Sequence, residues 1–208
     1  MSNFGKKHAV QVITLMAFVF VLAACGRATF GDTTQLARES AEQFMEAYSV
    51  PGLTIALVDA ENGFTWTYGF GYADSVNRVP VTEETLFAVA SISKPFTAIA
   101  VMQLILNAIS AEDERLLIQS SVMQMVDFDL TNTDRMAFGL GFSRRVSSEG
   151  LVFIGHEGWL RSYFSDMVFD LESGIGVFVA VNSASGFSVA TPLAEEILQS
   201  AINEKARQ

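Results

Sequence analysis

The sequence predicts an α/β sandwich in which an antiparallel sheet is flanked by helices from the two ends of the chain. Two observations lead to this fold class: amphipathic helix patterns near both ends, and a series of short strand patterns that turn residues separate. Such elements bury their apolar faces by packing a helical layer against a sheet. Half of the 208 residues are apolar, which is enough for the core of one domain.

The helix patterns are bounded by proline. Residues 35–48 carry apolar side chains at helical spacing, and this helix should end before Pro51. A second helix should run from about residue 91 to 107, because Pro95 is tolerated only in a first turn. Further helices are predicted over residues 116–126 and 188–205.

The strand patterns follow apolar, β-branched or alternating sequence. Residues 53–59 and 64–70 lie on either side of Glu61-Asn62-Gly63, whose residue types favour a turn, so the pair predicts a hairpin. Four more strands are predicted, over residues 137–143, 150–155, 163–170 and 175–182.

The N-terminus has the pattern of a bacterial lipoprotein precursor. Lys6 and Lys7 precede an apolar run that is short for a membrane span, and Leu22-Ala23-Ala24-Cys25 resembles a lipobox. We therefore expect a signal peptide over residues 1–24, lipidation of Cys25 and a polar tether over residues 25–34. The protein would then be lipid-anchored in the cell envelope, facing the periplasm or the cell exterior. A general secretory signal with a chance cysteine, or a short membrane anchor, is the alternative.

Charge and composition exclude several classes of function. The chain has 23 acidic against 13 basic residues, and two of the basic ones lie in the predicted signal. Such an acidic protein repels phosphate backbones, so we expect no nucleic-acid partner. One cysteine and two histidines give neither an intrachain disulfide nor a plausible zinc site. We expect no metal and no cofactor.

Ser91 and Lys94 are the strongest candidates for catalysis. A spacing of three residues at a helix start puts both side chains on one face, so the ammonium can sit beside the hydroxyl. The free amides and the positive dipole end of the first turn favour a developing oxyanion. Alone, the pattern also fits a helix cap followed by a solvated lysine.

The flanking sequence makes the catalytic interpretation stronger. A Pro-Gly pair leads into the first strand, and the stretches 69–74 and 80–87 precede Ser91. Their order and spacing are those of a known family. The chain resembles the serine β-lactamase and penicillin-binding-protein family, in its branch of class C β-lactamases, D-alanyl-D-alanine carboxypeptidases and esterases. A second match, Gly155-His156-Glu157-Gly158, stands where that family has a Lys-Thr-Gly or His-x-Gly strand.

The resemblance implies roles for the residues of the second match. His156 would help to hold the substrate carboxylate and the proton network, and Gly158 would let the substrate backbone approach. The amide of Trp159 would join that of Ser91 in an oxyanion hole. By itself, His156 also fits a surface residue at a strand end.

The chain departs from the family pattern in its middle. No tyrosine is followed two places on by asparagine. Ser75-Val76-Asn77 fits the alternative Ser-x-Asn letters, but it lies before Ser91, in a stretch that we interpret as a hairpin or loop. The family resemblance covers two blocks, 35–109 and 115–208, with an apparent internal deletion near residues 108–115. Most of the all-helical lobe would then be missing, and the apolar faces that it normally covers favour association.

Three functions fit these observations. The first is a serine hydrolase that acylates Ser91 with help from Lys94, on a small-molecule β-lactam, a peptidoglycan-like D-alanyl peptide or an ester. The second is a non-catalytic, membrane-tethered remnant of such an enzyme, because the missing region holds the family's Tyr-x-Asn. The third is an unrelated esterase that uses Ser91 and His156, although the chain has no Gly-x-Ser-x-Gly elbow. The sequence leaves the oligomeric state open.

Overall fold

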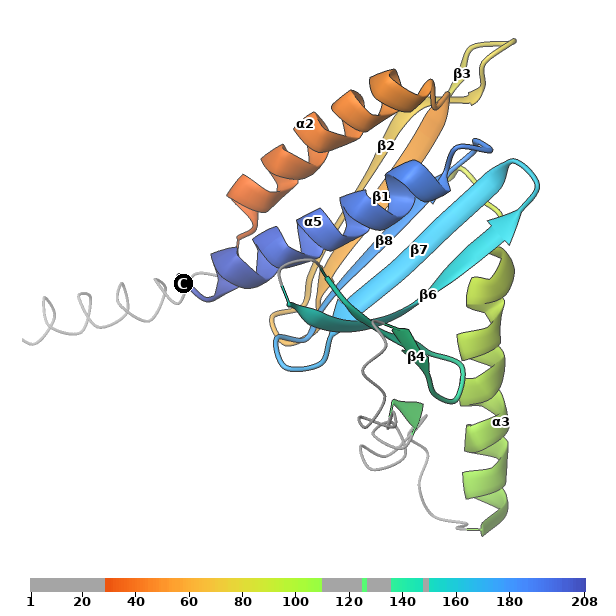
Figure 1. The fold of residues 1–208 in the computed structure, drawn as a ribbon, viewed down its shortest axis with the longest axis vertical. Helices are drawn as coiled ribbons and strands as arrows, with labels where there is room; N and C mark the ends of the chain where they lie inside the picture. Colours follow the sequence, from red (N-terminus) through yellow and green to blue (C-terminus); the bar gives the residue numbers. More distant parts are fainter. Residues whose placement is uncertain (1–28, 110–124, 127–135, 148–149) are drawn as a thin grey trace, which may run out of the picture.

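The structure, a computed structural model, describes residues 29–109, 125–126, 136–147 and 150–208 (Figure 1). Eight strands form one sheet in the order β3-β2-β1-β8-β7-β6-β5-β4, and every neighbouring pair is antiparallel. The strands are β1 (Gly52–Asp59), β2 (Phe64–Asp74), β3 (Val79–Pro80), β4 (Met136–Phe138), β5 (Ser143–Val146), β6 (Val152–Leu160), β7 (Tyr163–Asp170) and β8 (Ile175–Val181).

Helices cover the two faces of this sheet unequally. The long helices α2 (Gly31–Tyr48) and α5 (Phe187–Lys205) lie side by side on one face (Figure 1). The short 3-10 helix η1 (Ala90–Ile92) packs on β6 and β7 from the other face and leads into α3 (Ser93–Ile109). The predicted fold, an antiparallel sheet flanked by helices from both chain ends, is confirmed.

Alternation along β6 separates two apolar clusters. Phe153 belongs to the main core, where the sheet meets α2 and α5. The next residue, Ile154, belongs to a smaller cluster with Phe142 and with Ala98 and Ile99 of α3. Because successive side chains of a strand point to opposite faces, β6 separates a helix-covered face from the face that carries η1.

The helix α2 begins four residues earlier than predicted. Residues 31–34, assigned above to a tether, form its first turn, and Phe30 is only 1% exposed. The reason is a carboxylate from the other end of the chain: Glu204 of α5 accepts hydrogen bonds from the Thr33 amide (2.8 Å) and hydroxyl (2.7 Å). It thereby satisfies amides that the helix itself leaves free.

The strand prediction over residues 137–143 is wrong. A tight turn divides this segment into β4 and β5, with the Gly139 amide donating to the Phe142 carbonyl (2.8 Å). Gly141 has φ +89°, a backbone conformation that side chains strongly disfavour. The strand predicted over 150–155 is also longer than expected, because β6 continues to Leu160.

The remaining predicted elements are confirmed within one to four residues. The hairpin of β1 and β2 is present, β7 spans the predicted residues 163–170, and α5 closes the chain. The predictions for the signal peptide, for lipidation of Cys25 and for the helix start at 116 lie outside the described residues, as does most of the 108–115 junction. Among the residues that the structure describes, no helix combines the length and apolar character needed to cross a membrane.

Candidate functional site

Ser91 and Lys94 are in direct contact. Lys94 Nζ donates a hydrogen bond of 2.6 Å to Ser91 Oγ. Ser91 lies in η1, and Lys94 lies in the first turn of α3, where Pro95 leaves no helical hydrogen bond unmade. The local sequence therefore fixes the pair: a tight turn presents the hydroxyl, and the helix start presents the amine.

The turn that presents Ser91 is strained and well anchored. Ala90 has φ +47°, a left-handed conformation that costs a non-glycine residue on the order of 1 kcal/mol. The Val89 carbonyl next to it accepts hydrogen bonds from the Ile92 amide (3.1 Å) and from Ser165 Oγ of β7 (3.2 Å). These contacts hold the turn, and with it Ser91, against the sheet.

Gly158 is where this turn touches β6. A Cβ atom on Gly158 would lie 2.1 Å from the Val89 oxygen, far inside van der Waals contact. The glycine thus lets the Val89–Ser91 turn approach the strand. The resemblance assigned its small size to the approach of the substrate, and the structure shows a different reason within the protein itself.

Within the part of the chain that the structure describes, the second half of β6 has an open edge. There β5 pairs with Val152–Gly155, and residues 156–160 pair with β7 alone. The Ser147 amide donates to the Leu151 carbonyl (2.9 Å), and backbone groups alternate in direction along a strand. The N–H and C=O groups of Glu157 and Trp159 therefore point to the open edge.

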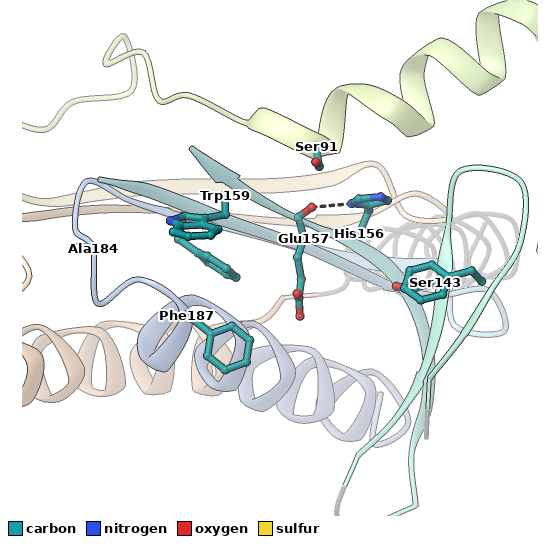
Figure 2. Close-up of a pocket in the computed structure, with 9 residues that line it drawn as sticks. Ser91, Ser143, His156, Glu157, Trp159, Ala184 and Phe187 are labelled. Carbon is teal, nitrogen blue, oxygen red and sulfur yellow. Dashed lines mark hydrogen bonds between the residues drawn. The ribbon is translucent and has the colours of Figure 1, made fainter. Parts of the chain in front are cut away.

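His156 bonds to this edge. Its Nδ1 lies 2.5 Å from the Glu157 carbonyl oxygen, as the dashed line in Figure 2 shows. A carbonyl can only accept, so Nδ1 carries the proton of this bond. The side chain of His156 lies on the η1 face of β6, because Gly158, two residues on, faces Val89.

A cavity of about 610 Å³ opens around the same edge (Figure 2). Ser91 lies on one side of β6, and the side chains of Glu157 and Phe187 lie on the other. The cavity is lined by Ser91, Phe138, Ser143, His156, Glu157, Trp159, Phe164, Ala184 and Phe187.

The structure thus gathers most of the predicted site residues. Ser91, His156 and Trp159 line one cavity, and Lys94 reaches it through Ser91. Gly158 lies behind the lining, under the Val89 turn. Within the ranges that the structure describes, no three His, Cys, Asp or Glu side chains are grouped to hold a metal ion.

Sequence comparison supports the family resemblance over the first half of the chain. Residues 37–113 match the model of the β-lactamase family. A β-lactamase of Pseudomonas fluorescens is 34% identical over 67 residues, which are 32% of this chain and 18% of that protein. The human mitochondrial serine β-lactamase-like protein LACTB is 34% identical over 80 residues, 38% of this chain and 14% of that protein.

The first half of this chain is similar to the serine β-lactamases. Its sequence match spans less than a quarter of the length of these relatives, and the match to the family model ends near the junction expected at residues 108–115. A third relative, the unguisins hydrolase ungD of Aspergillus violaceofuscus, is 36% identical over 83 residues, 38% of this chain and 14% of that protein.

Solved structures extend the likeness of the fold to the C-terminal half. SurE with D-Leu has a TM-score of 0.67 at 12% identity, covering 82% of this chain and 76% of that one. The octameric penicillin-binding protein homologue from Pyrococcus abyssi has a TM-score of 0.65 at 12% identity, covering 81% and 77%. At this identity the likeness concerns the fold alone.

Beneath the cavity lies a charged cluster that the sequence analysis missed. Arg145 of β5, 5% exposed, makes two hydrogen bonds to the buried carboxylate of Asp166 in β7 (2.8 and 2.9 Å) and one to Glu157 (3.0 Å). Arg145, Glu157 and Asp166 together cross-link the three neighbouring strands β5, β6 and β7 on the α5 side of the sheet. Its sequence signal is a carboxylate in the middle of an apolar strand, which needs a cation to be buried.

The cluster carries more negative than positive charge. Burial raises the pKa of Asp166 to about 6, although the Arg145 guanidinium acts in the opposite direction. Burial also raises the pKa of the Glu195 carboxyl on α5, again against the attraction of Arg145. The Arg145 guanidinium is therefore bonded to Asp166 and Glu157 and also attracts Glu195, and of these three carboxyl groups Glu157 lines the cavity.

Proposed function

We propose that this chain is a β-lactamase-related serine hydrolase that forms an acyl-enzyme at Ser91. The observation that carries the proposal is the 2.6 Å contact between Lys94 Nζ and Ser91 Oγ at the mouth of a cavity. A serine becomes a nucleophile when a neighbouring base takes its proton, and contact between the two groups is the geometric requirement.

In the proposed reaction, Ser91 Oγ attacks the substrate carbonyl carbon and its proton passes to Lys94. An ammonium has no lone pair, so Lys94 must be in its neutral form to accept this proton. The bond from the carbonyl carbon to the leaving group breaks, and the leaving group takes the proton. Water then releases the acyl group and restores the Ser91 hydroxyl.

The oxyanion of this reaction would be bound by the amides of Ser91 and Trp159. Two features of the fold support this assignment: the Trp159 N–H is directed to the open edge of β6, and both residues line the same cavity. Two convergent backbone donors are the usual form of such a site.

We also propose that the hydrolase is anchored in the cell envelope through a lipid on Cys25. The support is the lipobox-like sequence that ends at this cysteine. A protein held there would meet peptidoglycan-like peptides, β-lactams and esters outside the cytoplasm, and these are the substrate classes that the resemblance allows.

The test is intact-mass analysis of residues 26–208 after treatment with a fluorophosphonate and, separately, with a fluorescent penicillin. We expect a single adduct on the wild-type protein and none on Ser91→Ala. Ser93→Ala is the matched control, because its exposed serine lies two residues away in the same turn. A folded, monodisperse wild-type sample without any adduct would refute the proposal and favour a non-catalytic remnant.

A further inference from the structure

The cavity beside Ser91 has apolar walls on the side that faces α5. Its aromatic lining residues are Phe138, Trp159, Phe164 and Phe187. Phe164 and Phe187 meet edge to face at 5.6 Å, while Trp159 and Phe187 are 72% and 60% exposed. Large aromatic side chains that surround one hollow and remain exposed to water mark a surface that an apolar ligand stabilises.

The charge of the lining is unfavourable for an anion. Among the described residues that line the cavity, none is Lys or Arg, and the charged one is Glu157. The nearby guanidinium of Arg145 is buried and already bonded to Asp166 as well as to Glu157. A carboxylate entering this side of the cavity would therefore meet the like charge of Glu157, and the described lining offers it no free cation.

His156 does not supply the missing positive charge while its ring is neutral. Its Nδ1 proton is used in the bond to the Glu157 carbonyl, so the other ring nitrogen, Nε2, bears a lone pair. A lone pair repels a carboxylate and accepts from an N–H or O–H group. The role suggested by the family resemblance, holding a substrate carboxylate, is thus poorly matched to this arrangement.

From these observations we infer the substrate class: an ester or related acyl compound whose acyl group is apolar and uncharged. This inference rests on the proposed acylation of Ser91. The scissile carbonyl lies at Ser91 on one side of β6, and the acyl chain passes the open edge to reach Trp159 and Phe187 on the other (Figure 2). Ser91 Oγ bonds to the acyl carbon, the alcohol leaves with the proton, and water hydrolyses the acyl-serine to the free acid.

The first arm of the test measures binding without turnover. In the Ser91→Ala protein, the fluorescence of Trp159 is titrated with methyl octanoate and with monomethyl suberate, which share the methyl ester and an eight-carbon chain and differ in a carboxylate at the far end of the chain. We expect methyl octanoate to bind at least about tenfold more tightly, since one unfavourable charge pair near a protein surface suffices for this factor. The Trp159→Phe variant, which keeps Trp66, verifies the origin of the signal.

The second arm identifies the source of the discrimination. Glu157→Gln should narrow the difference between the two ligands, whereas Glu172→Gln should leave it unchanged. Glu172 is the matched control because it carries the same charge on an exposed turn after Asp170, at the end of β7 remote from Phe164. Phe187→Ala should weaken binding of methyl octanoate.

The outcomes separate this inference from the proposed function. Preferential binding of methyl octanoate with no fluorophosphonate adduct on Ser91 would support the apolar site and refute the hydrolase. An adduct on Ser91 together with equal affinity for methyl octanoate and monomethyl suberate would refute the substrate class alone. If Glu157→Gln left the difference in affinity between the two ligands unchanged, the proposed substrate class would likewise be refuted.

Discussion

Replacing Arg145 by methionine should destabilise the protein, and the loss should depend on pH. Methionine is similar in length to the aliphatic part of arginine, but it lacks the guanidinium that Asp166 and Glu157 share. Burial already holds the pKa of Asp166 at about 6, well above its ordinary 3.8. Its ionisation therefore lowers stability as the pH rises from 4 to 6 in the wild-type protein.

The size of the effect follows from two contributions. Without Arg145, Asp166 takes up a proton instead of remaining buried and unpaired, and at pH 7, about one unit above the wild-type pKa, this costs about 1.4 kcal/mol. The two lost hydrogen bonds leave a buried carboxyl poorly satisfied, at a cost of roughly 1 to 3 kcal/mol. We expect a total of roughly 2.5 to 4.5 kcal/mol at pH 7, and about 1.2 kcal/mol less at pH 5.5.

Urea denaturation at the two pH values measures both quantities. Arg144→Met is the control, because this half-exposed neighbour lies on the other face of β5 and its loss should cost under about 0.5 kcal/mol. A loss below about 1 kcal/mol for Arg145→Met at pH 7 would refute the proposed importance of the pair. An equal loss at both pH values would refute the assignment of the raised pKa to Asp166.

Two further substitutions test close contacts of the fold. Gly158→Ala places a Cβ 2.1 Å from the Val89 oxygen, so the Ser91 turn must move. The rate of fluorophosphonate labelling should then fall at least about tenfold. Gly176→Ala is the control, because its Cβ meets nothing nearer than 3.7 Å and should leave the labelling rate unchanged. Glu204→Ala removes the acceptor of the Thr33 amide and should lower the free energy of unfolding by about 1 to 2 kcal/mol, measured by urea denaturation, and an unchanged midpoint would show that α2 needs no such cap.

Local patterns in the sequence predicted most of the sheet and the Ser91–Lys94 contact. The apolar run of β7 and the turn residues between β1 and β2 act within a few positions, so periodicity and turn chemistry suffice. The contact of Ser91 with Lys94 is likewise local, since three residues at a helix start determine it.

The features that the sequence did not predict depend on distant partners. The start of α2 is set by Glu204, which lies 171 residues after Thr33, and Asp166 is satisfied by an arginine 21 residues away. The close approach of Val89 to Gly158 joins a turn to a strand that begins some sixty residues later. Periodicity carries no information about which distant groups meet, so these contacts could not be read from the chain.

The joined ends of α2 and α5 also set a length scale. Gln208 donates to the Thr29 carbonyl at one end of α5, whereas Phe187 at its other end lines the cavity. Nineteen helical residues that rise 1.5 Å each make α5 about 28 Å long (Figure 1). An attachment on the N-terminal side of Thr29 would therefore be separated from Phe187, in the lining of the cavity, by about the length of α5.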